Sequence, residues 1–137
     1  MRKSVAIVGA GASGCICTYF LLKSGCNVTL YDKNLPLRTL LPTGGGRCNL
    51  AHAEYDFKEL AKNYPRGEKF LYSVFSKFST SDSLCMFEEM GIKTYVQEDG
   101  RIFPESNSSQ KVQETILKEL RRMGVKFVQS EIKGCEK

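Results

Sequence analysis

Residues 9–14 read Gly-Ala-Gly-Ala-Ser-Gly and match the pattern G-x-G-x-x-G. Because the pattern alone is weak, its surroundings decide what it means. Ser4–Val8, just before it, is a β-branched apolar run that is typical of a buried parallel strand. Ala12–Lys23, just after it, predicts a helix that stops at Ser24-Gly25, and Asn27–Tyr31 predicts a second strand. This order and spacing predict a right-handed βαβ unit.

Each glycine of the motif has a physical reason in a turn that binds a phosphate. Gly9 permits the tight turn, Gly11 lets the backbone approach a pyrophosphate, and Gly14 lets the helix lie close to the sheet. Ala12 and Ser13 lie in the first turn of the predicted helix, where unpaired N–H groups and the helix dipole favour a phosphate. The alternative is a glycine-rich turn that binds no ligand.

Asp32 closes the second predicted strand and is followed by Lys33. A carboxylate at this place can accept hydrogen bonds from the ribose hydroxyls of adenosine. It also disfavours a 2′-phosphate, so the motif favours FAD or NAD over NADP. A surface aspartate with no ligand is the alternative.

Residues 43–49 read Thr-Gly-Gly-Gly-Arg-Cys-Asn and form a second glycine cluster. Ordering such glycines costs roughly 1 kcal/mol or more each. That cost suggests a backbone pressed against something flat or anionic, and Arg47 could give a charge-assisted bond to a phosphate. A flexible linker is the alternative.

The rest of the chain predicts an excursion followed by a return to the α/β pattern. We expect a loop over residues 33–52, helices over 55–63, 68–78 and 81–90, and a hairpin of strands 92–97 and 101–103. A helix capped by Ser108 or Ser109 and a last strand over 125–128 complete the pattern. The domain organisation expected is a nucleotide-binding start (1–52), a helical and hairpin insertion (53–107), and a helix with a third parallel strand (108–137).

The composition excludes several classes of protein. The 137 residues suit one domain, and 20 basic against 15 acidic residues give a net charge of +5. The positive charges are dispersed, which favours a solvated surface over a nucleic-acid patch. The N-terminal apolar run is too short and too broken by glycine for a secretory or membrane segment. Six cysteines without C-x-x-C spacing and a single histidine argue against a metal site, and favour a cytoplasmic chain with mostly buried thiols.

At this point the chain resembles a known family, the BaiN/YhiN-like flavoproteins, which are also labelled NAD(P)/FAD-dependent or aminoacetone-oxidase-like oxidoreductases. The similarity runs from Val5 to about Ile132. Its most specific part is the second glycine cluster. The segments that carry it are residues 9–14, Asp32-Lys33-Asn34, residues 40–49, residues 70–73, residues 98–104 and residues 117–125.

The resemblance implies a Rossmann-like, glutathione-reductase-like FAD-binding domain with a parallel sheet. The first glycine motif would hold the pyrophosphate and Asp32 the ribose, and Arg38 would lie near the phosphates. Lys33, next to Asp32, is a further candidate cofactor-binding residue. The backbone near Ile132 would lie close to the adenine. The flavin side would be lined by Gly45, Gly46, Arg47, Cys48 and Asn49. The implied activity is that of an FAD-dependent oxidoreductase, with NAD(P)H as a candidate electron donor and an unknown small-molecule substrate; no catalytic residue is identified.

Two features depart from the family pattern. Leu37-Arg38-Thr39 lacks one positive charge of the usual Gly-Arg-Lys, and Asp32 replaces the commoner glutamate. The chain also covers only the front third of the family's length, so we expect a truncated domain. Its first strand should then be an apolar edge that invites self-association.

Two other functions stay open. One is an NAD-binding dehydrogenase fragment, although such a domain needs no second glycine cluster. The other is a non-catalytic remnant. For Cys48 we expect a structural rather than a redox role.

Overall fold

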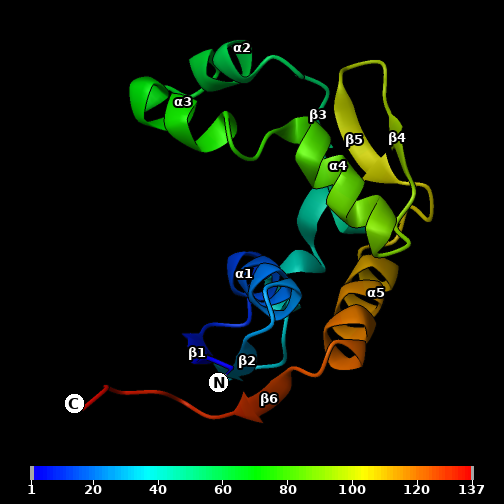
Figure 1. The fold of residues 1–137 in the computed structure, drawn as a ribbon. Helices are drawn as coiled ribbons and strands as arrows, with labels where there is room; N and C mark the ends of the chain where they lie inside the picture. Colours follow the sequence, from blue (N-terminus) through cyan, green and yellow to red (C-terminus); the bar gives the residue numbers. More distant parts are fainter. Residues whose placement is uncertain (1, 137) are drawn as a thin grey trace. The chain divides into compact units, whose positions relative to one another are not determined.

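The computed structural model describes residues 2–136, which form two compact units (Figure 1). The first unit combines the two ends of the chain, up to Thr43 and from Ser109 onward. The second unit is Gly44–Ser108. The first glycine motif therefore belongs to the first unit, whereas the second glycine cluster belongs, from Gly44 onward, to the second unit.

The first unit is built on a parallel sheet of three strands. Its strand order is β1 (Ser4–Val8), β2 (Asn27–Asp32) and β6 (Lys126–Gln129), with β2 in the centre. The register aligns Val8 with Tyr31, and Tyr31 with Val128. The strands therefore end together, and the predicted βαβ unit and third parallel strand are confirmed.

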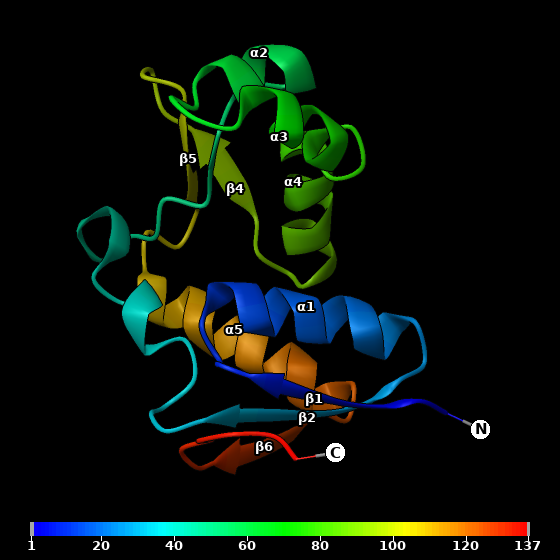
Figure 2. The ribbon, with the colours of Figure 1, turned by 90° about the vertical axis from the view of Figure 1, so that its left-hand side faces the viewer.

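Two helices cover one face of this sheet, as Figure 2 shows. They are α1 (Ala12–Lys23), which connects β1 to β2, and α5 (Ser109–Arg122), which precedes β6. The central strand contributes the buried Val28 and Leu30. Helix α5 buries an apolar stripe of its own, through Val112, Ile116, Leu117 and Leu120. The parallel sheet thus has its core on the helical face.

The opposite face of β1 is left open by the described residues of the first unit. Ala6 is exposed there and the Val8 side chain is 65% exposed. Parallel sheets usually have both faces covered. The strand also lies at the end of the sheet order, so the expected apolar edge is present.

The second unit combines three helices with a small antiparallel sheet. The helices are α2 (Phe57–Lys62), α3 (Glu68–Phe75) and α4 (Thr80–Glu89). The sheet has the order β3 (Ala51–His52), β5 (Arg101–Pro104), β4 (Thr94–Val96). Its core includes the fully buried Ile102 and Phe103. Two short 3-10 helices lie near the start of this unit. η1 (Arg38–Leu40) precedes it, and η2 (Thr43–Gly46) spans its first residues.

The hairpin of β4 and β5 is confirmed, whereas β3 was not predicted from the sequence. A strand of two residues is too short to show an alternating pattern, and it exists because Leu50 and Ala53 donate to the carbonyls of Ile102 and Gly100. The N-cap of α4 is Ser79, which forms a capping box with Asp82.

The expectation of mostly buried thiols is wrong. Only Cys15 and Cys48 are buried, Cys26 is half-buried, and Cys17, Cys85 and Cys135 are exposed. On α1 the reason is geometric, because side chains two positions apart in an α-helix point in directions that differ by about 200°. Burial of Cys15 therefore turns Cys17 towards solvent.

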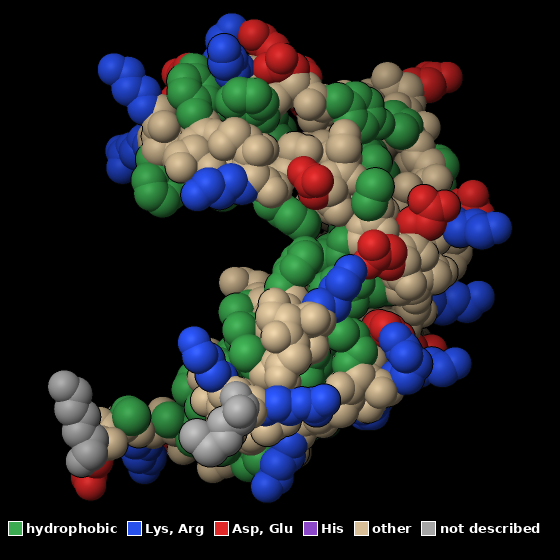
Figure 3. All heavy atoms as spheres, in the orientation of Figure 1, with side chains coloured by type: hydrophobic (Ala, Val, Ile, Leu, Met, Phe, Trp, Pro, Cys, Tyr) green, Lys and Arg blue, Asp and Glu red, His purple; other side chains and the backbone are tan. Residues whose placement is uncertain are grey.

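The surface charge is mixed, as the composition indicated. On the face shown in Figure 3, basic side chains are scattered over both units and interspersed with acidic and apolar ones. None of the helices within residues 2–136 combines the length and the apolar character that crossing a bilayer requires.

We expect the edge of β1 to pair with a second copy of the chain. Asn27 donates to the Lys3 carbonyl and Gly9 donates to Tyr31, so alternation directs the N–H groups of Ser4, Ala6 and Val8 outward. Ala6→Pro removes one outward donor from an edge strand, where proline is tolerated. In sedimentation equilibrium, self-association should weaken in Ala6→Pro and persist in the control Ala6→Ser. A wild-type chain that stays monomeric at all concentrations would contradict this expectation.

Candidate functional site

The glycine turn between β1 and α1 presents backbone donors. Gly9 has a φ of +100° and donates its N–H to the Tyr31 carbonyl over 2.8 Å, which fixes the turn against β2. Gly11 is the N-cap of α1, and the first bond inside the helix runs from Cys15 N–H to Gly11 O. The N–H groups of Ala12, Ser13 and Gly14 precede that bond. They are the donors that a helix N-terminus offers to an anion.

Two glycines of the turn differ in what surrounds them. A Cβ on Gly14 would lie 1.8 Å from the Gly9 carbonyl oxygen, so the helix can approach the turn only with glycine there. A Cβ on Gly11 would meet nothing within 4 Å. Gly14 is therefore required by the fold, whereas Gly11 keeps open space in front of the turn.

Asp32 holds the turn from the other side. Its carboxylate accepts the N–H of Asn34 over 2.7 Å and the N–H of Ala10 over 2.8 Å. These two bonds, that of Asn34 first, hold the pKa of Asp32 below its usual range, and the charges of Lys33 and Arg38 add to the effect. An ionised carboxylate has about four acceptor sites, so two remain for hydroxyl donors.

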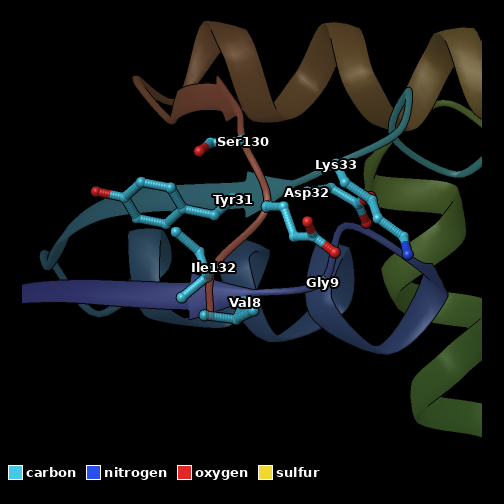
Figure 4. A pocket seen from close by; sticks show the side chains of 8 residues that line it. Val8, Gly9, Tyr31, Asp32, Lys33, Ser130 and Ile132 are labelled. Atoms are coloured by element: carbon cyan, nitrogen blue, oxygen red, sulfur yellow. The ribbon is translucent and has the colours of Figure 1, made fainter. Parts of the chain in front are cut away.

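A pocket of about 270 Å³ opens beside this carboxylate (Figure 4). Four of its lining residues were predicted from the sequence, namely Gly9, Asp32, Lys33 and Ile132. The segment after β6 is placed there because Ser130 donates its N–H to the Asp32 carbonyl over 2.9 Å. Sequence reasoning missed the remaining lining residues Val8, Tyr31, Ser130 and Glu131. The available signal was that ligands of such sheets bind beyond the carboxyl ends of the strands.

Arg38 does not line this pocket. It is exposed in η1, directly after Leu37, which is buried and has a left-handed φ of 57°. The Leu37 N–H donates to the Ala10 carbonyl over 2.7 Å. The loop that carries Arg38 is therefore joined to the glycine turn.

Cys15 is buried next to the turn, and its thiol is unreactive. Burial, followed by the charge of Asp32, raises the pKa of its thiol to about 12. The thiol donates to the Ala10 carbonyl over 3.6 Å. A neutral, buried thiol is a packing group and not a nucleophile.

The second glycine cluster has a separate geometry in the second unit. Gly44, Gly45 and Gly46 all have left-handed φ angles. A Cβ on Gly44 would lie 2.7 Å from the Asn49 nitrogen, whereas Gly45 and Gly46 face open space. The backbone at Gly45 and Gly46 can therefore be approached closely.

The polar residues of the cluster are held within the same unit. The Arg47 guanidinium lies 4.1 Å from the centre of the Phe103 ring, a cation–π contact. Cys48 is 1% exposed, as a structural role requires. With its amide nitrogen turned to the sheet, Asn49 donates to the Ala51 and Ile102 carbonyls. The structure thus gathers Gly9, Asp32, Lys33 and Ile132 at one pocket, and keeps residues 45–49 together in the other unit.

Comparison with known proteins gives a family match over nearly the whole chain. Residues 3–137 match the family described as HI0933-like protein Rossmann domain. The ribosomal RNA dihydrouridine synthase of Haemophilus influenzae is 30% identical over 133 residues, which cover 96% of this chain and 32% of that protein. The 3-dehydro-bile acid delta(4,6)-reductase of Clostridium scindens is 30% identical over 126 residues, with 90% and 30% covered. The chain therefore spans about a third of the length of these curated relatives.

A solved structure shows the same fold. THI4 of Thermovibrio ammonificans superposes with a TM-score of 0.55 at 15% identity, covering 93% of this chain and 38% of that chain. The family resemblance and the Rossmann-like fold class expected from the sequence are both confirmed.

We expect Gly14→Ala to destabilise the fold and Gly11→Ala to spare most of it. The new methyl group at Gly14 would collide with the backbone at Gly9, at a cost of about 3 kcal/mol. At Gly11 the methyl group meets open space, and the loss of a glycine N-cap costs about 1 kcal/mol at most. Urea unfolding of both variants measures the difference. Equal stabilities would show that α1 does not need the close approach.

We expect the stabilisation by Asp32 to depend on pH. Because its pKa is lowered in the folded state, the contribution is complete above the unfolded-state pKa of about 4 and is lost as the pH falls through the folded value. Asp32→Asn should lower the free energy of unfolding by roughly 1–3 kcal/mol at pH 7. The gap to the wild type should narrow below about pH 4, as urea titrations at both pH values would measure. A gap that does not change with pH would contradict a role for the carboxylate charge.

Proposed function

Because the chain belongs to the HI0933-like Rossmann domain family, we propose that it forms the FAD-binding part of an FAD-dependent oxidoreductase. The observation that carries this proposal is the pocket at the ends of β1 and β2, where the glycine turn meets the ionised Asp32. Asp32 in this pocket would accept the ribose hydroxyls, and the N-terminus of α1, which follows the glycine turn, would donate to the pyrophosphate.

The pyrophosphate would lie against the N-terminus of α1. Ala12, Ser13 and Gly14 offer their N–H groups, and Gly11 leaves room for the phosphate oxygens. Arg38 would add positive charge from the neighbouring loop.

The adenosine end would occupy the pocket beside Asp32. The two free acceptor sites of the carboxylate suit the two ribose hydroxyls, and its charge opposes a 2′-phosphate. Val8, Tyr31 and Ile132, which line the pocket, would provide an apolar wall for the adenine. A volume of about 270 Å³ lies just below the usual range for whole ligands, about 300–1,000 Å³, so the pocket suits the adenosine end and not the entire FAD.

The flavin end would use the second glycine cluster. Gly45 and Gly46 have open space above their backbone, which a flat ring system needs. When bound, FAD supplies the electron-transfer chemistry, while the protein binds and orients it.

The proposal also covers the class of reaction and the cellular location of the protein. Hydride would come from NAD(P)H, and the name of the Clostridium scindens relative, a reductase, supports this class. The two relatives have names with unlike substrates, so the proposal extends to no particular substrate. A cytoplasmic location, which the cysteine usage favours, is part of it.

We expect the purified chain to bind FAD and Gly11→Val to lose that binding. The valine side chain would occupy the space of the pyrophosphate while leaving the rest of the fold intact. Quenching of flavin fluorescence measures binding, and urea unfolding checks the fold. If flavin binding survives the substitution unaltered, the proposed site is wrong.

Thermal unfolding in the presence of NAD or FAD separates the other functions. A chain that is stabilised by NAD and not by FAD would be an NAD-binding dehydrogenase fragment. A chain that responds to neither would be a non-catalytic remnant.

A further inference from the structure

The loop after β2 is held in place by α5. Residues 33–42 contain no regular structure apart from η1, and such loops are mobile unless they are tied down. The Gln113 side-chain amide donates to the Pro36 carbonyl over 2.9 Å, and the Ser109 hydroxyl donates to the Leu41 carbonyl over 2.6 Å. Both donors come from the first half of one helix, and their acceptors bracket residues 37–40.

The bracketed segment has a conformation that needs support. Leu37 is in the left-handed region, a conformation that a leucine keeps only if its surroundings fix it. Its side chain is 1% exposed and its N–H is bonded to Ala10. Ser109 is also buried, at 4% exposed, so its hydroxyl needs the Leu41 carbonyl as a partner.

Arg38 is the only charged side chain between the two fixed points. The segment is joined to the glycine turn at Ala10, whose carbonyl accepts the Leu37 N–H and whose own N–H donates to the Asp32 carboxylate. A shift of the loop would therefore move Arg38 relative to the turn.

From this geometry we propose that Gln113 and Ser109 are positioning residues of the cofactor site. By fixing Pro36 and Leu41 they hold η1 so that the Arg38 guanidinium is presented to the diphosphate of the ligand. The inference rests on the proposed function and adds to it two residues that touch no ligand themselves.

A double-mutant cycle on the full chain tests the proposal, with ADP as the probe and calorimetry as the measurement. Gln113→Met removes the donor but keeps the length of the side chain, and should weaken ADP binding about fivefold, the worth of one neutral hydrogen bond. Gln110→Met is the matched control, because Gln110 lies on the same helix and its amide reaches only Glu114. It should leave ADP binding unchanged.

The second arm asks whether Gln113 acts through Arg38. In the Arg38→Gln background, Gln113→Met should have no further effect on ADP binding, whereas a purely structural role would weaken binding by the same factor in both backgrounds. Ser109→Ala repeats the cycle with an independent variant in case one protein does not fold. Fully additive effects, or an unchanged affinity in Gln113→Met, overturn the inference. A wild-type chain that binds neither ADP nor FAD overturns the proposed function instead.

Discussion

The bond between the Asp32 carboxylate and the Ala10 N–H is the constraint on which the first unit depends. It joins the end of β2 to the turn that follows β1, over a span of 2.8 Å and across 22 residues of chain. Side chains alternate between the faces of a strand, so a slip of β2 by one residue would turn the carboxylate away from the turn. The group that would receive the ribose therefore also fixes the register of the sheet.

The sequence was sufficient for those parts of the fold whose signal is local. β1, α1 and β2 were predicted because a β-branched run, three spaced glycines and a second apolar run lie within about thirty residues, the usual length of a βαβ unit. The short β3 was missed, because its two residues are recruited by the edge of β5 and have no periodicity of their own. The exposure of Cys17 was missed because hydrophobic character alone does not say which face of α1 is covered.

The residues of the candidate site also differ in whether the sequence contains a local signal for them. Gly9 and Asp32 follow from the motif and its spacing, and the family resemblance added Lys33 and Ile132, all of which line one pocket. Ser109 and Gln113 were out of reach, because they bond to carbonyls 68 and 77 residues away and any donor of suitable length would look the same in the sequence. Contacts to backbone carbonyls leave no trace in the identity of the acceptor residue.

Because one side of β1 is uncovered, the free energy of unfolding depends on what else is in the solution as well as on the chain itself. Ala6 and Val8 face outward there, and whatever covers them only in the folded state stabilises that state by mass action. A melting temperature of this protein would then rise with the concentration of whatever covers that side. Values obtained at different dilutions would describe different equilibria.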